Sequence, residues 1–228
     1  MGDSALQGEV TGGSFRAVIF DMDGVIADSE PTYLEAINLV LAPTGHHMSE
    51  KRYEGVIGSS VHVTWRTILD TFGIEGDIEE YVPRYDRALV ELLRRPLPPL
   101  PGVGELLGEL RHRRLPAALA TSSWQRWAEA LLQATGLDGA FDAVVWREMV
   151  DRPKPAPDLF LRAAELVGVD PAGCIVLEDT APGLEAARAA GMLAVQVRSA
   201  STALPPQPHA DLVLDSLDDF PIALLAEA

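Results

Sequence analysis

The sequence has little of what would let it form a disulfide or cross a membrane. Cys174 is the only cysteine among 228 residues, so we expect no internal disulfide and a buried structural thiol in a reducing compartment. No apolar run is long enough to span a bilayer. Residues Met1–Ser14 lack the basic start and apolar centre of a secretory signal. We therefore expect a cytoplasmic protein with no membrane partner.

Positive charge is also scarce. The chain has 18 basic and 34 acidic residues, which gives a formal net charge of −16, and only Lys51 and Lys154 are lysines. The short run of Arg111, Arg113 and Arg114 is interpreted as the solvated end of a helix. Because phosphate-backbone binding needs concentrated positive charge, we expect no nucleic-acid partner. An anionic substrate would need a local positive site or a metal ion.

What is present favours an α/β fold with a sizeable core. The hydrophobic content of 47% is ordinary for a globular protein. Short, almost continuously apolar runs predict buried parallel strands, and the later runs are separated by helical patterns. The sequence therefore predicts a doubly wound, Rossmann-like parallel sheet. The predicted strands are Arg16–Phe20, Pro116–Ala120, Ala143–Trp146, Cys174–Leu177, Ala194–Val197 and Asp211–Leu214.

The alternation is interrupted between the first two strands. Residues 31–95 show only helical patterns and end in a proline-rich segment that cannot continue a helix. We therefore expect a helical cap domain at 31–95, inserted into a core domain made of 15–30 and 96–228. Residues 1–14 are expected to form a flexible tail.

Polar side chains follow the predicted strands at the points where the strands end. Because ligands bind outside the carboxyl ends of parallel strands, these side chains are expected to share one site. Carboxylates, hydroxyls and a single lysine suit a hard divalent cation and a phosphate bound together. The candidate residues, in chain order, are Asp21, Asp23, Thr121, Ser122, Lys154, Glu178 and Asp179.

Each group has a physical role in such a site. Asp21 and Asp179 would repel each other when crowded, and Mg²⁺ would relieve that repulsion. The Thr121 hydroxyl and the Ser122 amide, expected at a helix start, can bind phosphate oxygens. Lys154 would add a fixed positive charge, at a place where a guanidinium would not fit.

These elements resemble the four ordered motifs of the haloacid dehalogenase superfamily. They are Asp21-x-Asp23-Gly24, Thr121-Ser122, Lys154 and Glu178-Asp179, and the resemblance extends from about Phe15 to Val197. The flanking segments 154–158 and 178–183 agree as well. The helical insertion matches the cap that the family places after its first motif, as in its β-phosphoglucomutase and phosphoglycolate phosphatase-like members.

The resemblance implies a mechanism and a cofactor. Asp21 would be the nucleophile and become an aspartyl phosphate. Asp23 would protonate the leaving oxygen and then activate water, while its carbonyl contacts Mg²⁺. Asp179 would be a direct metal ligand, with Glu178 a ligand or a residue that holds the ligands. The presence of Asp23 argues against a true dehalogenase, which lacks the second aspartate.

The expected function is thus Mg²⁺-dependent hydrolysis of a small phosphorylated metabolite, such as a sugar phosphate, by a monomer or weak homodimer. A phosphosugar mutase like β-phosphoglucomutase shares all four motifs and is one alternative. When the motifs are matched, Tyr33 stands at that enzyme's histidine position and Val61 at its cap arginine, which favours hydrolysis. A non-catalytic phosphoryl-sensing module, such as a receiver domain, is the other alternative, but receivers lack a long helical cap.

Overall fold

The structure, a computed structural model, describes residues 14–200 and 205–227. The flexible tail expected at 1–14 lies outside the described residues except for Ser14. Contacts divide the chain into two compact units, one made of residues 1–28 and 97–228 and the other of Ser29–Pro96. Among the described residues, no helix is both long and apolar enough to cross a membrane.

The larger unit is built around one parallel sheet. Its six strands follow the spatial order β3-β2-β1-β4-β5-β6, and every neighbouring pair is parallel. The strands lie within a residue or two of the ranges predicted from the apolar runs. Their bounds are β1 Ala17–Phe20, β2 Ala117–Ala120, β3 Ala143–Val145, β4 Cys174–Glu178, β5 Leu193–Val197 and β6 Leu212–Leu214.

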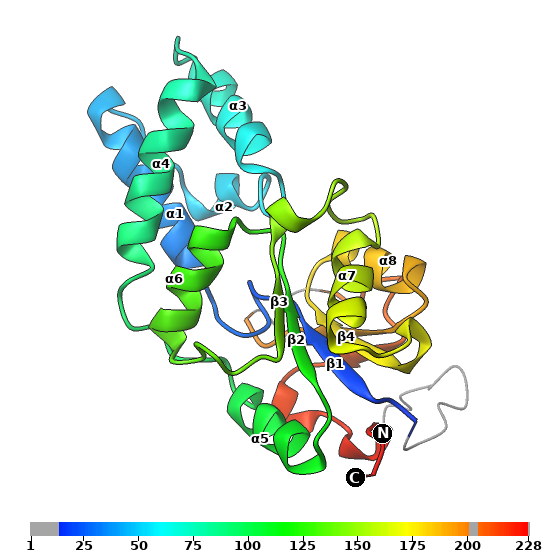
Figure 1. Cartoon of the computed structure of the whole chain (residues 1–228). Helices are drawn as coiled ribbons and strands as arrows, with labels where there is room; N and C mark the ends of the chain where they lie inside the picture. Colours follow the sequence, from blue (N-terminus) through cyan, green and yellow to red (C-terminus); the bar gives the residue numbers. More distant parts are fainter. Residues whose placement is uncertain (1–13, 201–204, 228) are drawn as a thin grey trace, which may run out of the picture. The chain divides into compact units, whose positions relative to one another are not determined.

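Helices cover both faces of this sheet, as a doubly wound fold requires. Figure 1 shows α7 and α8 on one side of the sheet and α5 and α6 on the other. On the α7/α8 side, Phe160 and Leu184 pack against Ile19 and Val176 in a buried apolar cluster. The helices are α5 Val103–Arg113, α6 Gln125–Thr135, α7 Asp158–Val167 and α8 Ala181–Ala189; short 3₁₀ turns follow at Arg147–Met149, Pro171–Gly173, Leu217–Asp219 and Ile222–Leu224.

The smaller unit is entirely helical. Three long helices follow the predicted patterns, and α1 and α3 each pack against α4. Trp65 is fully buried in this unit and stacks on Tyr81 at a centroid distance of 5.3 Å. The bounds are α1 Glu30–Leu41, α2 Glu50–Tyr53, α3 Val61–Phe72 and α4 Ile78–Leu92, with a 3₁₀ turn at Ala42–Thr44.

One local expectation was wrong. Thr121 and Ser122 do not start a helix, because α6 begins at Gln125 and the intervening residues form a loop. Leu166 of α7 is apolar but 44% exposed. The buried face of α7 includes Leu159, Phe160 and Ala163, and Leu166 lies outside this face.

Candidate active site

Asp21 directly follows the central strand β1 and is 94% shielded, with an exposed fraction of 6%. Its backbone N–H donates to the Leu177 carbonyl at 2.8 Å, which ties it to the neighbouring strand β4. The chain then turns sharply, and Gly24 N–H donates to the Ala27 carbonyl at 2.9 Å. Gly24 has a φ of +75°, a left-handed conformation that favours glycine. The turn brings the Asp21–Asp23 segment across the carboxyl end of the sheet.

Lys154 reaches the same place from the loop before α7. Its side chain is 7% exposed, and its ammonium forms an ion pair with Asp21 Oδ1. It also donates to Glu178 Oε2 at 2.7 Å and to the Ala120 carbonyl at 3.3 Å. An ammonium has three N–H donors, so these three acceptors satisfy it completely. Lys154 therefore links the ends of three adjacent strands.

Glu178, the last residue of β4, is fully buried and has both carboxylate oxygens occupied. Oε2 accepts from Lys154. Oε1 accepts from the Thr180 hydroxyl at 2.7 Å and from the Thr180 and Asp179 backbone N–H groups at 3.0 and 3.2 Å. A Cβ on Gly183 would collide with the Glu178 carboxylate, so only glycine leaves room for it. Glu178 is thus held in one position by its surroundings.

Asp179 differs from Glu178 in having an unsatisfied oxygen. Its Oδ1 atom is buried and has no hydrogen-bond partner among the described residues. Its carboxylate packs directly against Gly24, where a Cβ would collide with Oδ2. A buried carboxylate oxygen without a partner is costly unless something binds it. The geometry therefore leaves one oxygen at the site open to a ligand.

Asp23 points to a different neighbour. Its Oδ2 accepts a hydrogen bond from the Ser123 hydroxyl at 3.1 Å, so the side chain is oriented by the loop after β2. Asp23 is half-buried, in contrast to the buried Asp21. Its carboxylate is outside the group that Asp21, Glu178 and Asp179 form. The two aspartates of the first motif therefore occupy distinct environments.

Thr121 and Ser122 form the other side of this edge. Thr121 is buried, and its hydroxyl oxygen accepts from Ser123 N–H at 3.0 Å, which leaves its proton available for donation. Ser122 is exposed, and no described residue accepts from its backbone N–H. The loop is fixed by Thr121 N–H, which donates to the Val145 carbonyl at 2.9 Å. Two donors are thus available from a loop whose backbone is held in place.

Comparison with known proteins decides the family. Residues 18–197 match the model of the haloacid dehalogenase-like hydrolases, which is most of the chain. This chain belongs to the haloacid dehalogenase-like hydrolases.

The relatives of this hydrolase include both phosphatases and a mutase. Fructose-1-phosphate phosphatase YqaB of Escherichia coli (strain K12) is 40% identical over 187 residues, which cover 81% of this chain and 97% of the relative. β-Phosphoglucomutase of Bacillus subtilis (strain 168) is 32% identical over 219 residues, covering 93% and 94%. The crystal structure of β-phosphoglucomutase from Clostridium difficile matches with a TM-score of 0.74 at 25% identity, covering 90% and 92%.

Burial and charge shift the pKa values of the site carboxyls in opposite directions. Burial, reinforced by the negative charge of Glu178, raises the pKa of Asp21 to about 8 despite Lys154. Burial and the charges of Glu178 and Asp21 raise the pKa of Asp179 well above its usual value. Burial also acts to raise the pKa of Glu178, but Lys154 outweighs it and the pKa is lowered. Burial acts to lower the pKa of Lys154, yet its two carboxylate partners leave that pKa raised.

These residues fit a hard divalent cation. Asp21, Glu178 and Asp179 each offer an oxygen, and the three oxygens lie within 4.8 Å of one another. Oxygen ligands are what Mg²⁺ prefers. The unpartnered Asp179 Oδ1 supplies a specific atom for it, whereas hydrogen bonds already occupy both oxygens of Glu178. Asp21, Glu178 and Asp179 could therefore hold a divalent cation, with Asp179 Oδ1 as the oxygen that no described residue occupies.

Three residues that shape this site were not among the candidates from sequence. Thr180 holds Glu178, and Gly24 and Gly183 leave room for the two acidic side chains. Thr180 carried a readable signal, because a threonine before Ala-Pro is typical of a helix N-cap. Its side chain does accept from Gly183 N–H at 3.2 Å at the start of α8. Both glycines belong to the motif segments 21–24 and 178–183, but the contact of Gly24 with Asp179 joins segments far apart in sequence and could not be predicted from either one.

Proposed function

We propose that this hydrolase is a Mg²⁺-dependent phosphatase that acts on a small phosphorylated metabolite of the sugar phosphate class. The observation that carries the proposal is Asp21, buried beside Lys154 at a site with an open Asp179 oxygen. The 40% identity to a fructose-1-phosphate phosphatase supports the substrate class. The net charge of −16 disfavours nucleic acid as the substrate.

In the first half-reaction, Asp21 acts as the nucleophile. Its Oδ1 is paired with Lys154, which leaves Oδ2 to form the bond to phosphorus. The bond from phosphorus to the substrate oxygen breaks, and Asp23, in its protonated form, gives its proton to that leaving oxygen. The products of this step are the free alcohol and a phosphorylated Asp21.

The second half-reaction reverses the role of Asp23. Its carboxylate now takes a proton from water as the water oxygen attacks phosphorus. The bond between phosphorus and Asp21 breaks, which releases inorganic phosphate and regenerates the carboxylate. The hydrogen bond from Ser123 keeps Asp23 pointing in one direction through both steps.

The remaining groups bind and neutralise the phosphoryl group. The Thr121 hydroxyl and the Ser122 N–H can donate to its oxygens, as the free donors of that loop allow. Mg²⁺, held by Asp21 and Asp179, would supply positive charge that offsets the carboxylates and the phosphate. Among the described residues, Lys154 is the basic side chain that pairs with Asp21, and it contributes a further positive charge there.

The proposal is tested by assaying purified protein against a panel of phosphorylated metabolites with Mg²⁺. We expect release of inorganic phosphate that depends on Mg²⁺ and is lost in Asp21→Asn, by at least about a thousandfold. Asn has nearly the same shape as Asp but is a poor nucleophile, so the variant should remain folded. Turnover that persists in Asp21→Asn, or in excess chelator, would refute the mechanism.

The 32% identity to β-phosphoglucomutase makes a phosphosugar mutase the second candidate. The two activities are separated by incubating the protein with β-glucose 1-phosphate, a trace of glucose 1,6-bisphosphate and Mg²⁺. We expect free phosphate to be the main product. Rapid formation of glucose 6-phosphate with little free phosphate would assign the mutase activity instead.

A further inference from the structure

The connection from β3 to α7, which carries the site lysine, also contacts the loop that follows β2. Its first residues form the 3₁₀ turn Arg147–Met149. The Arg147 N–H donates to the Ser123 carbonyl at 3.1 Å. The Gln125 N–H donates toward both carboxylate oxygens of Glu148, each at 3.2 Å. These two bonds join the turn to Ser123 and to the first residue of α6.

Glu148 supplies what α6 lacks at its start. The residue before the helix is Trp124, and its side chain makes no cap hydrogen bond. An indole has an N–H donor and no acceptor, so it cannot bind the free N–H groups of the first helical turn. A carboxylate at this place also interacts favourably with the helix dipole. The cap of α6 therefore comes from a residue 23 positions away from Gln125 in the sequence.

The loop after β2 is anchored at two places, and Glu148 belongs to the second. The first is Thr121, whose N–H donates to the Val145 carbonyl at 2.9 Å. The second consists of Ser123 and Gln125, which bond to the 3₁₀ turn. Loss of the Glu148 carboxylate would leave the Thr121 anchor intact and would remove a bond from the second half of the loop.

Ser123 connects this second anchor to the proposed acid–base residue. Its hydroxyl donates to Asp23 Oδ2 at 3.1 Å. An aspartate gives its proton efficiently to a leaving oxygen only when its carboxyl points at that oxygen. Because the hydroxyl bond constrains this direction, a shift of Ser123 is passed on to Asp23. Two hydrogen bonds and a short piece of backbone thus link Glu148 to Asp23.

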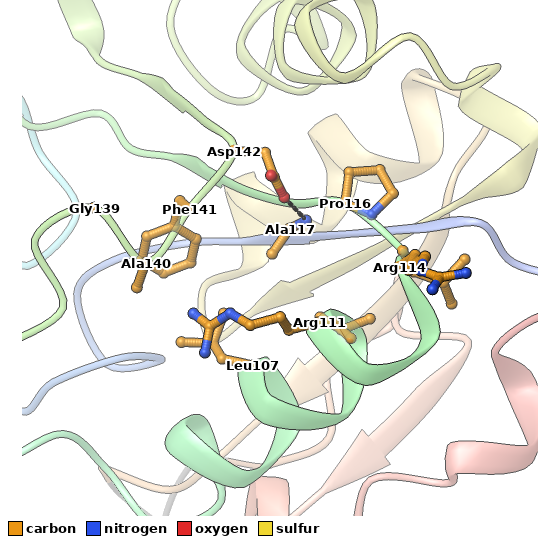
Figure 2. A pocket seen from close by; sticks show the side chains of 11 residues that line it. Leu107, Arg111, Arg114, Pro116, Ala117, Gly139, Ala140, Phe141 and Asp142 are labelled. Atoms are coloured by element: carbon orange, nitrogen blue, oxygen red, sulfur yellow. Dashed lines mark hydrogen bonds between the residues drawn. The ribbon is translucent and has the colours of Figure 1, made fainter. Parts of the chain in front are cut away.

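The same pair of strands has a comparable carboxylate contact at its other end. Figure 2, a view of the pocket beside the start of β2, shows Asp142 bonded to Ala117, whose N–H donates to Asp142 Oδ2 at 2.9 Å. Asp142 and Glu148 are both exposed. Because the four residues of β2 span roughly 13 Å, Asp142 lies far from the loop that contains Ser123. Asp142 therefore makes the same kind of contact without the connection to Asp23.

We propose that Glu148 is a positioning residue that acts through Ser123 on Asp23, a role that rests on the phosphatase function proposed above. Glu148 exchanges no proton in this role. It holds Ser123 so that Asp23 faces the leaving oxygen when the bond from phosphorus to that oxygen breaks. Its loss should therefore matter most for a substrate whose leaving alcohol needs a proton, and least for one that releases a stable anion.

The test compares the best sugar phosphate of the panel with p-nitrophenyl phosphate, whose leaving group is a stable phenolate. The quantity compared is kcat/KM, because it reports the steps up to departure of the alcohol in the first half-reaction. We expect Glu148→Ala to lower kcat/KM about tenfold for the sugar phosphate, which is part of the whole effect of general acid catalysis. For p-nitrophenyl phosphate the loss should be less than about twofold.

Three further variants separate positioning from a merely structural role. Glu148→Gln keeps an oxygen that can accept from the Gln125 N–H, and it should restore most of the activity on the sugar phosphate. Ser123→Ala should show the same dependence on the leaving group, and adding Glu148→Ala to it should lower kcat/KM no further, because both act on one path. Asp142→Ala is the matched control. It should lower the melting temperature, as Glu148→Ala should, but leave the ratio of the two kcat/KM values unchanged.

Hydrogen–deuterium exchange tests the contacts without any substrate. Glu148→Ala should speed exchange in residues 123–127, and Asp142→Ala should not. An inactive wild-type chain would refute the phosphatase function and this role of Glu148 with it.

With an active wild-type chain, three results would overturn the role of Glu148 and leave the phosphatase function standing. The first is the same loss on both substrates in Glu148→Ala, or no loss. The second is an equal dependence on the leaving group in Asp142→Ala. The third is unchanged exchange in residues 123–127 of Glu148→Ala.

Discussion

Lys154 has as many acceptors as it has N–H donors, and they come from three separate strand ends. Its pairs with Asp21 and Glu178 and its bond to the Ala120 carbonyl use the full coordination of a compact ammonium. A guanidinium is planar and larger, and it cannot direct three donors around one nitrogen. Charge alone therefore does not define this position.

We expect Lys154→Arg to lower kcat by about a hundredfold although the charge is kept. The chain offers a matched control, because Lys51 is its only other lysine and is exposed on α2. Lys51→Arg should leave kcat and KM unchanged. Steady-state kinetics on the best substrate of the panel make the comparison, and near-normal kcat in Lys154→Arg would show that Lys154 is peripheral.

Asp179 is the residue with an oxygen still to be satisfied. Asp179→Asn keeps the size of the side chain but removes its charge and one of the two oxygens that can bind a cation. We expect Mg²⁺ affinity, measured by titration calorimetry, to fall by about a hundredfold. Asp215→Asn, at an exposed aspartate that pairs with Arg198, is the control and should bind Mg²⁺ normally. Unchanged affinity in Asp179→Asn would remove Asp179 from the ligands.

The start of helix α8 connects the fold to the site through Thr180. The Thr180 hydroxyl accepts from Gly183 N–H as a helix cap and donates to Glu178 Oε1. One side chain thus begins the helix and positions a buried carboxylate. Loss of this hydroxyl should affect stability and activity together.

We expect Thr180→Ala to lower the free energy of unfolding by about 1 kcal/mol, from loss of the cap. It should also lower kcat, because Glu178 loses a hydrogen bond that holds it. Thr180→Ser keeps the hydroxyl and should retain both properties. Urea denaturation and steady-state kinetics on the two variants check this, and equal behaviour of Ala and Ser would exclude a role for the hydroxyl.

The elements of the sheet could be predicted from sequence because each strand is buried on both faces. Such strands read as uninterrupted apolar runs, and the polar residue that ends a run marks the ligand edge. Local cues were less informative where tertiary contacts decide the outcome. The loop Thr121–Ser123 is held by the Val145 carbonyl, so α6 starts only at Gln125.

The contacts inside the site could not be predicted from the order of residues. The motifs predicted that Lys154 and Glu178 lie at the same edge of the sheet. They did not predict which three oxygens accept hydrogen bonds from the Lys154 ammonium. Nor could they indicate that Asp179 keeps an unpaired oxygen while Glu178 does not. These differences depend on how segments about 25 to 150 residues apart pack against each other.

For the molecule as a whole, the carboxyl cluster makes stability depend on pH. Folding raises the pKa of Asp21 from 3.8 to about 8, so between these values the metal-free folded state holds a proton that the unfolded chain has lost. Stability therefore falls as pH rises through this range, by at most about 1.4 kcal/mol per pH unit for one proton. The raised pKa of Asp179 also makes stability fall as pH rises. The lowered pKa of Glu178 affects stability only when the pH falls below the ordinary pKa of a glutamate.

A divalent cation competes with these protons, so its effect should grow with pH. We expect the rise in melting temperature caused by Mg²⁺, relative to chelator, to be larger at about pH 8 than at about pH 5.5. Asp179→Asn should reduce the rise at both pH values. The measurement is a thermal scan of each protein with Mg²⁺ and with chelator, and an equal or larger rise at the lower pH would contradict the assignment of protonated carboxyls.

Strands β1 and β4 are paired in the middle of the sheet, with Phe20 opposite Leu177. Asp21 and Glu178 come directly after these two positions. Backbone amides in central strands exchange with solvent only when the whole domain opens, unlike those of termini and loops. We therefore expect the carboxylates to be attached to the slowest-exchanging part of the protein. Partial fraying of the outer elements leaves them in place, and the chain loses this site only in the event that unfolds its core.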